Sequence, residues 1–135
     1  MTGDRPLRFI AIDDDKDSAE LIARVAERCG YSTEVMTDSR ALELILMDGA
    51  PDVLCLDLSM PGVNGLDAVE ALGRVKFGGQ VIIVSGHPTC LRQHVSSVAK
   101  THGLNVAGHF QKPINTADFA RFLRGVEVVR RNGTI

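Results

Sequence analysis

Two short, uninterrupted apolar runs constrain the fold of this chain more than any other feature of its sequence. Residues 53–56 read Val-Leu-Cys-Leu, and residues 81–84 read Val-Ile-Ile-Val. A strand with one solvated face alternates polar and apolar residues, whereas a continuous apolar run of this length is typical of a strand covered on both faces. Both runs therefore predict central strands of a sheet that lies between two layers of other structure.

Strand and helix patterns alternate along the rest of the chain. Strands are predicted at residues 7–12, 31–36, 53–56, 81–84 and 106–110. Helices with one apolar side are predicted at residues 17–29, 41–47, 66–75 and 88–102, followed by a last helix that Asn115 caps and whose inward face runs from Phe119 to Val129. This repeated βα alternation implies a parallel sheet covered by helices on both faces.

Glycines and one alternating segment refine this prediction. Gly30 is expected to end the first helix, because glycine readily follows a helix with left-handed backbone. Gly78 and Gly79 are expected to interrupt the third helix beyond residue 75. Residues 31–36 alternate polar and apolar side chains, which favours a half-exposed strand at an edge of the sheet.

Length and composition exclude several classes of protein. A chain of 135 residues with 44% hydrophobic residues suits one compact domain. The net charge of -2 and the lack of a basic run argue against nucleic-acid binding. No apolar segment approaches the roughly 18 residues of a membrane span, and no signal-peptide pattern follows Met1, so we expect a cytoplasmic protein with no membrane partner. The scattered cysteines, Cys29, Cys55 and Cys90, favour neither a disulfide framework nor a zinc site.

Polar residues directly follow most of the predicted strands. They are Asp13, Asp14 and Asp15 after the first strand, Asp57 after the third, Ser85 after the fourth and Lys112 after the fifth. The carboxyl ends of parallel strands meet at one edge of a sheet, where ligands bind in folds of this kind. We therefore expect carboxylates, a hydroxyl and an ammonium group to converge at that edge.

These groups suit phosphoryl transfer. Neighbouring carboxylates repel one another, and a hard divalent cation such as Mg²⁺ would relieve the repulsion. A carboxylate beside such a cation can attack phosphorus and form an acyl phosphate. Asp57 is the expected nucleophile because its strand is the most apolar and central one. Lys112 would then neutralise the phosphate oxygens, and Ser85 would donate a hydrogen bond to one of them.

Each group also has a purely structural interpretation. An acidic run after a strand is often a solvated turn or a helix cap, and Asp57 precedes a Pro-Gly loop in which it could serve as a turn residue. Ser85 alone could be structural, and Lys112 alone could be a surface lysine. Their occurrence together at the ends of strands in one sheet favours the functional interpretation.

Four motifs resemble the signature of response-regulator receiver domains. They are Ile12-Asp13-Asp14-Asp15, the segment Asp57-Leu58-Ser59-Met60-Pro61-Gly62-Val63-Asn64-Gly65, Val84-Ser85-Gly86 and Lys112-Pro113. The resemblance extends over residues 7–129. It implies a doubly wound, flavodoxin-like (βα)5 fold, which is an α/β three-layer sandwich with a parallel sheet of order 2-1-3-4-5.

The resemblance implies a phosphoacceptor and a metal site. Asp57 matches the aspartate that takes phosphate from a sensor histidine kinase or a phosphotransfer protein. Asp14 matches a direct ligand of Mg²⁺ (or Mn²⁺), and Asp13 matches its neighbour, which acts largely through water. Asp57 itself and the backbone carbonyl of Ser59 would complete the site.

The resemblance also implies a switch. Ser85 matches the hydroxyl that moves toward the phosphoryl group, and Lys112 matches the lysine that pairs with it. Pro113 matches a proline that often follows a cis peptide bond. His109 departs from the family, which usually has a rotating aromatic residue there, so His109 is either a switch residue sensitive to pH near neutrality or an ordinary surface histidine. The stretch from Ser85 to Lys112 is longer than is typical, which predicts an extended fourth helix or flanking loop.

We predict a phosphorylation-dependent signalling switch and not a conventional enzyme. Its receiver domain would span residues 7–130, and its only catalysis would be its own phosphorylation and dephosphorylation. Residues 1–6 are expected to be a flexible tail, and residues 131–135 a tail or the start of a linker to an output domain. The part from Ser85 to Asn115 is also similar to receivers joined to cyclic-di-GMP phosphodiesterases. The resemblance leaves open a homodimer through the fourth helix, the fifth strand and the fifth helix.

Two alternatives remain open on the sequence. A phosphatase of the haloacid dehalogenase type also uses an Asp nucleophile, a hydroxyl, a Lys and Mg²⁺, and Asp13-Asp14-Asp15 contains its D-x-D pattern. The segment that begins at Asp57 and the lack of a cap domain count against it. A degenerate receiver, a binding module that never takes phosphate, would lack an acid or the lysine, and neither is missing.

Overall fold

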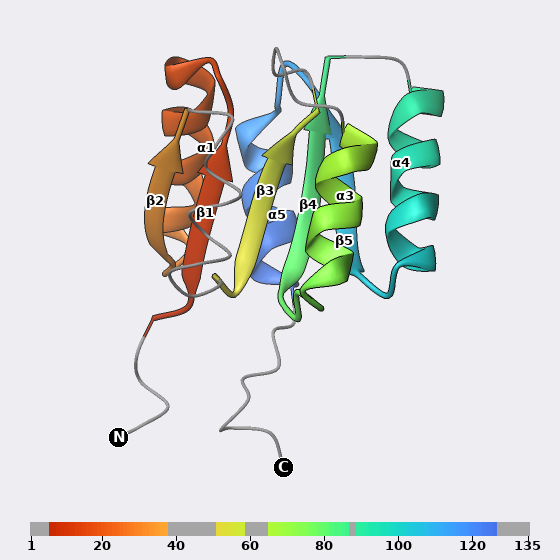
Figure 1. The fold of residues 1–135 in the computed structure, drawn as a ribbon. Coiled ribbons are helices and arrows are strands. Elements are labelled where there is room, and N and C mark those ends of the chain that lie inside the picture. The colour runs from red at the N-terminus through yellow and green to blue at the C-terminus, as the bar shows by residue number, and fades with distance from the viewer. Residues whose placement is uncertain (1–5, 38–50, 59–64, 87–88, 127–135) are drawn as a thin grey trace.

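The computed structural model describes residues 6–37, 51–58, 65–86 and 89–126, in which strands and helices alternate (Figure 1). The strands are β1 Arg8–Ile12, β2 Ser32–Met36, β3 Val53–Asp57, β4 Gln80–Ser85 and β5 Asn105–Gln111. The helices are α1 Lys16–Arg28, α3 Gly65–Arg74, α4 Thr89–Thr101 and α5 Thr116–Arg124. The helix predicted at residues 41–47 lies outside the described residues. Within the described ranges, no helix combines the length and the apolar composition needed to cross a membrane.

The sheet is parallel throughout and has the order β2-β1-β3-β4-β5, which confirms the predicted doubly wound topology. The two apolar runs form the central strands β3 and β4, which are almost entirely buried. β2, with its alternating pattern, lies at an edge and is partly exposed. The sheet is the middle of three layers, with α3 and α4 on one face and α1 and α5 on the other (Figure 1).

Alternate residues of the central strands enter two separate cores. In β3, Leu54 and Leu56 pack with α3 and α4, whereas Val53 and Cys55 pack with α1 and α5. Successive side chains of a strand point to opposite faces, so a strand between two cores has to be apolar at every position. Cys55 belongs to one of these cores, and burial raises the pKa of its thiol.

Three helices end in the same way. The second residue after each helix has a positive φ angle, which is 98° at Gly30, 56° at Lys76 and 80° at Gly103. The next amide then reaches back across the last turn, as when Phe77 N donates to the carbonyl of Leu72 at 3.0 Å. This Schellman motif satisfies carbonyl groups that the end of a helix leaves without partners.

The third helix, α3, ends at Arg74, within one residue of the predicted end, and before the two glycines. Lys76 takes the left-handed position instead. Gly79 is needed for packing, because a Cβ atom there would lie 2.7 Å from the carbonyl oxygen of Asp52 and 2.8 Å from Cζ of Phe77.

The last helix is also shorter than predicted. α5 ends at Arg124 and Gly125 caps it, with the Gly125 amide donating to the carbonyl of Phe122 at 3.0 Å. Val126 packs against the core from beyond the helix. Val129, which the apolar pattern included in the helix, lies outside the described residues.

β5 contains one residue more than its partner strand. The register passes from Val81–Val106 directly to Ile82–Gly108, so Ala107 has no counterpart in β4. An extra residue of this kind forms a β-bulge, which changes the direction of the side chains that follow it.

The bulge determines toward which face of the sheet the last residues of β5 are directed. Gly108 faces α5, because a Cβ atom there would lie 2.8 Å from Cζ of Phe122. Phe110 packs on the same helix, with its ring centroid 5.0 Å from those of Phe119 and Phe122. His109 lies between Gly108 and Phe110, on the opposite side of the strand, and is exposed.

Lys76→Gly should stabilise the protein. An L-residue in left-handed backbone costs about 1 kcal/mol more than glycine does, so the free energy of unfolding should rise by about 1 kcal/mol in urea denaturation. Gly103→Ala is the opposite test, because no atom lies within 4 Å of a Cβ atom placed at Gly103 and only the backbone conformation is penalised. Gly103→Ala should lose a similar amount, and equal stabilities of both variants and the wild type would contradict this account of the helix ends.

Candidate functional site

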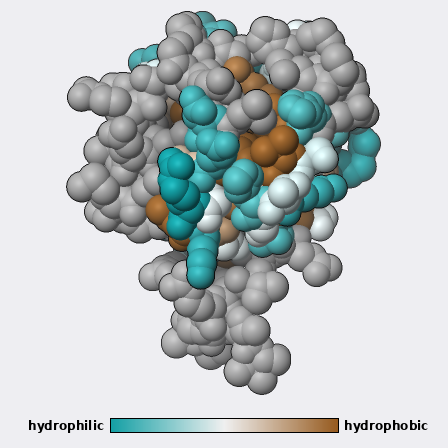
Figure 2. All heavy atoms as spheres, turned by 45° about the vertical axis from the view of Figure 1, so that its right-hand side comes forward, coloured by the Kyte–Doolittle hydropathy of each residue, from teal (hydrophilic) through white to brown (hydrophobic). Residues whose placement is uncertain are grey.

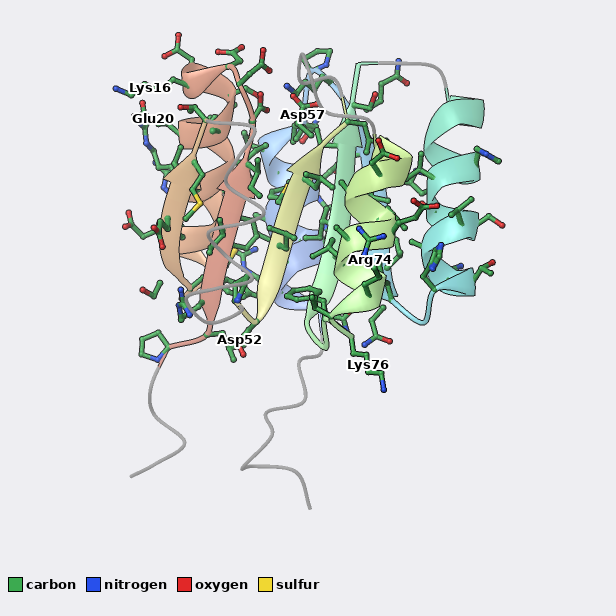
Figure 3. All side chains as sticks on the ribbon, in the orientation of Figure 1. Lys16, Glu20, Asp52, Asp57, Arg74 and Lys76 are labelled. Carbon is green, nitrogen blue, oxygen red and sulfur yellow. The ribbon has the colours of Figure 1, made fainter. Side chains whose placement is uncertain are left out.

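The carboxyl edge of the sheet brings the predicted polar residues together. Asp57 and Ser85 are the last residues of β3 and β4. Asp13 directly follows β1, and Lys112 directly follows β5. Figure 3 shows Asp57 at this edge, and Asp52 at the opposite end of the molecule, where β3 begins.

Three carboxylates meet at this edge. One oxygen atom each of Asp13, Asp14 and Asp57 lies within 4.8 Å of the other two. Asp13 and Asp57 are only 1% and 2% exposed, whereas Asp14 is exposed. Two buried carboxylates this close together are stable as anions only if a positive charge lies beside them.

Lys112 supplies that positive charge. Its Nζ atom lies 2.7 Å from Oδ2 of Asp13 and 3.2 Å from Oδ2 of Asp57. The longer of these contacts is a hydrogen bond that Lys112 donates to Asp57. The backbone amide of Lys112 also donates to the carbonyl of Ser85 at 3.0 Å. The lysine is therefore positioned by its backbone as well as by the carboxylates.

Asp13 and Lys112 keep each other ionised. Burial alone would raise the pKa of Asp13, but the ammonium of Lys112 and the backbone amide of Asp15 together hold that pKa below its ordinary value. Burial alone would lower the pKa of Lys112, but Asp13 and Asp57 raise it above its ordinary value. The two shifts have the same physical origin, an ion pair in a partly dehydrated site.

Asp15, the third residue of the acidic run, has a structural role. Its side chain accepts a hydrogen bond from the amide of Asp17 at 3.1 Å and so caps α1. Its own amide donates to Oδ1 of Asp13 at 2.9 Å, which orients that carboxylate. The helix-cap interpretation is thus correct for Asp15. The signal for it was the position of Asp15 just before the predicted helix.

Ser85 is fully buried at the end of β4, which lies between β3 and β5. It lies opposite Gln111 in the register of β4 and β5. The residue before it, Val84, accepts a hydrogen bond from the amide of Leu58 at 2.9 Å. The backbone just beyond Asp57 and the backbone of Lys112 are therefore both bonded to the end of β4.

The sequence also predicted roles for Ser59, Pro113 and His109. Ser59 lies outside the described residues, so its carbonyl ligand stays a prediction. The Lys112–Pro113 peptide bond is cis. His109 is exposed on the edge strand β5, and its part in switching stays a prediction.

The donor set fits a small, hard divalent cation. Carboxylate oxygens are ligands that Mg²⁺ and Mn²⁺ take readily. Oδ2 of Asp13 is buried and, apart from its contact with Lys112, makes no well-aligned hydrogen bond to the described part of the chain. Asp14 adds an exposed oxygen on the side from which an ion can enter.

The fold and the site together are those of a flavodoxin-like α/β receiver. The model of the response regulator receiver domain family matches residues 9–124, and the chain belongs to this family.

Relatives and solved structures agree with this assignment. The protein-glutamate methylesterase/protein-glutamine glutaminase of Gluconobacter oxydans (strain 621H) is 32% identical over 114 residues, which are 83% of this chain and 31% of that protein. A response regulator from Colwellia psychrerythraea superposes with a TM-score of 0.77 and 27% identity, covering 88% of this chain and 94% of that one. A response regulator from Burkholderia pseudomallei, with a phosphorylated aspartic acid, a calcium ion and citrate, has a TM-score of 0.68 and 22% identity over 88% of this chain and 67% of that one. The chain spans between 31% and 63% of the length of the first curated relatives that it matches.

Lys112→Met should reveal the cost of burying Asp13 and Asp57. The substitution keeps most of the side-chain volume and removes the ammonium. We expect a loss of roughly 3 kcal/mol in the free energy of unfolding without divalent cations, because a buried charge that loses its partner costs about this much. Urea denaturation measures the loss, and added Mg²⁺ should restore part of it by replacing the missing positive charge.

Lys100→Met, at an exposed position of α4, is the control and should stay within about 0.5 kcal/mol of the wild type. Equal stabilities of the two variants would show that Lys112 does not compensate the carboxylates.

Proposed function

We propose that Asp57 accepts a phosphoryl group and that this receiver domain thereby works as a phosphorylation-dependent switch in two-component signalling. One observation carries the proposal. The buried carboxylate of Asp57 lies 3.2 Å from the ammonium of Lys112 and shares the carboxyl edge of the sheet with Asp13 and Asp14. The phosphorylated aspartic acid of the Burkholderia pseudomallei response regulator supports the same chemistry on the same fold.

The transfer is a displacement at phosphorus. An oxygen of Asp57 forms the new P–O bond while the P–N bond of a phosphohistidine donor breaks, and the donor imidazole leaves. Lys112, already beside the Asp57 oxygen, pairs with the incoming phosphoryl oxygens, and Ser85 donates a hydrogen bond to one of them. A bound Mg²⁺ or Mn²⁺ supplies further charge neutralisation, and Asp13, Asp14, Asp57 and the carbonyl of Ser59 would hold it.

The donor we propose is a sensor histidine kinase or a phosphotransfer protein. The domain helps to form and to hydrolyse its own acyl phosphate and turns over no outside substrate. An appended or separate output domain reads the result. The proposal of an output domain is supported by the length of the relatives, of which the chain matches only a part.

We infer that the conformational change caused by phosphorylation is transmitted from the site through β5 and α4. Lys112 and Ser85, which pair with the phosphoryl group, are joined by a backbone hydrogen bond of 3.0 Å. Ser85 precedes α4, and Lys112 directly follows β5, which contains the exposed His109. We therefore place the readout on the face formed by α4, β5 and α5, which is also the face expected for a homodimer.

Asp14→Asn should weaken cation binding without destabilising the fold. Asp14 is exposed, so its neutralisation removes a ligand charge and no buried contact. Calorimetric titration with Mg²⁺ should show a loss of about tenfold in affinity or more, which corresponds to about 1.4 kcal/mol. Asp15→Asn is the matched control, because asparagine caps a helix as well as aspartate does and Asp15 lies outside the cluster. An affinity unchanged by Asp14→Asn, or reduced equally by both variants, would contradict the proposed site.

A phosphodonor test decides the assignment of Asp57. Incubation with acetyl phosphate and Mg²⁺ should add the mass of one phosphoryl group to the wild type and to Asp118→Asn, whose carboxylate is exposed and paired with Arg121. Asp57→Asn should gain nothing. A gain that survives in Asp57→Asn would move the acceptor to another residue, and no gain in the wild type with any donor would favour a degenerate receiver.

The same samples separate a switch from a phosphatase. A switch binds one phosphoryl group per chain and releases it slowly, whereas a phosphatase of the haloacid dehalogenase type would release phosphate from small phosphoesters over many turnovers. We expect no such turnover. Sustained phosphate release that Asp57→Asn abolishes would support the phosphatase instead.

A further inference from the structure

An open hollow lies at the amino edge of the sheet, the edge at which the strands begin. Its volume is about 260 Å³, and three separate parts of the fold form its walls. Leu7 precedes β1, Cys29 and Tyr31 belong to the turn between α1 and β2, and Leu123 and Val126 belong to the end of α5. Apolar side chains predominate among these residues, so the hollow suits an apolar group.

Two contacts hold the walls of the hollow together. Sγ of Cys29 lies 3.7 Å from the carbonyl oxygen of Ala120, and the hydroxyl of Tyr31 lies 3.5 Å from the carbonyl oxygen of Leu123. Both contacts join the turn after α1 to the last turns of α5. Figure 1 shows β1 beginning at the lower edge of the sheet, whereas Figure 3 shows Asp57 at the upper edge. The hollow is therefore a formed feature of the fold and is remote from the candidate site.

The apolar atoms on the side that carries α4 are arranged differently. Figure 2 shows them at the surface, between hydrophilic ones. Single apolar groups in such a setting are normal for the surface of a protein. The hollow at the amino edge is more specific, because walls from three parts of the fold limit the shape of a group that can enter it.

The chain itself continues from the rim of the hollow. α5 ends at Arg124, Gly125 caps it, and Val126 then lines the hollow and packs against the core. Residues 127–135 follow in the sequence. Alternate residues of an extended segment are directed to the same side. An extended segment with Val126 on the inside would therefore place Val128 on the inside as well.

The charges beside the hollow match those of the segment that follows. Arg124 lines the hollow and is exposed, and it forms no salt bridge with another described residue. Glu127 lies between Val126 and Val128 in the sequence, so it would be directed outward, where this guanidinium is. α1 ends beside the hollow, and the negative end of its dipole favours a basic residue such as Arg130.

We propose that residues 127–130 dock along the amino edge of the sheet and that Val128 fills the hollow between the ends of α1 and α5. The docked segment fixes the direction in which the chain leaves the receiver domain, at the edge opposite Asp57. An output domain attached through this segment would be held at that edge. The proposal goes beyond the proposed function and requires no phosphoryl group.

Nuclear Overhauser effects between Tyr31 and Val128 test the proposal directly in the full chain. Tyr31 is the only tyrosine of the chain, so its ring signals are identified without ambiguity. We expect effects between its ring protons and the methyl groups of Val128, because side chains that pack together approach within about 4.5 Å. A mixture of isotope-labelled and unlabelled chains distinguishes contacts within one chain from contacts between two chains.

The reactivity of Cys29 gives a second test. In a Cys90→Ser background the remaining thiols are Cys29, which lines the hollow and is partly exposed, and Cys55, which is buried in the core. Val128→Ser should raise the rate at which iodoacetamide alkylates Cys29 by about tenfold. This change corresponds to about 1.4 kcal/mol, which is close to the contribution of one buried valine side chain. Val129→Ser, the same substitution at the next position, is the matched control and should leave the rate unchanged.

Several results would overturn the proposal. A contact of Tyr31 with Val128 of another chain would assign the hollow to a second copy of the protein. The lack of any such contact, an unchanged alkylation rate in Val128→Ser, or a faster rate in Val129→Ser alone would show that Val128 does not fill the hollow. Phosphorylation of Asp57 by acetyl phosphate should be the same in both variants as in the wild type, since Asp57 lies at the opposite edge. Failure of the wild type to take phosphate would contradict the proposed function and not the docking of Val128.

Discussion

Two carboxylates can be buried side by side in this protein because one ammonium group lies between them. Lys112 Nζ is 2.7 Å from Asp13 and 3.2 Å from Asp57, and each of these contacts joins segments that are far apart in the sequence. The ion pair ties the end of β5 to the ends of β1 and β3, across the central strand β4. The charges that suit the site to phosphate and to a divalent cation therefore also hold the carboxyl edge of the sheet together.

The parallel topology adds a second electrostatic effect. The helices of a doubly wound sheet run opposite to its strands, so their positive N-terminal ends lie toward the carboxyl edge. The described helices follow this polarity, with acidic residues in the first turn of three of them, Asp17, Asp67 and Asp118. Basic residues occupy the last turns, among them Arg28, Arg74 and Lys100. The edge that holds Asp57 is thus the edge at which backbone dipoles favour negative charge.

A local irregularity in β5 determines how the edge of the sheet beside the site is arranged. The bulge at Ala107 turns Phe110 toward α5 and leaves His109 exposed on the other side of the edge strand. α4 begins four residues after the end of β4 at Ser85, and beyond its other end Gly73 of α3 lies close to His102. β5 is partly exposed at an edge of the sheet, whereas the central strands β3 and β4 are almost entirely buried.

The sequence by itself determined the layers of the fold and the members of the site. Continuous apolar runs can be satisfied only between two cores, and the residues that end parallel strands must meet at one edge, so β3, β4, Asp57 and Lys112 followed from local patterns. Only the tertiary structure decided that Asp15 caps a helix, that Lys76 takes the left-handed position after α3, and that β5 has a bulge at Ala107. Each of these depends on the backbone angles or neighbours that packing imposes on one residue, and many sequences with the same apolar pattern would leave them open.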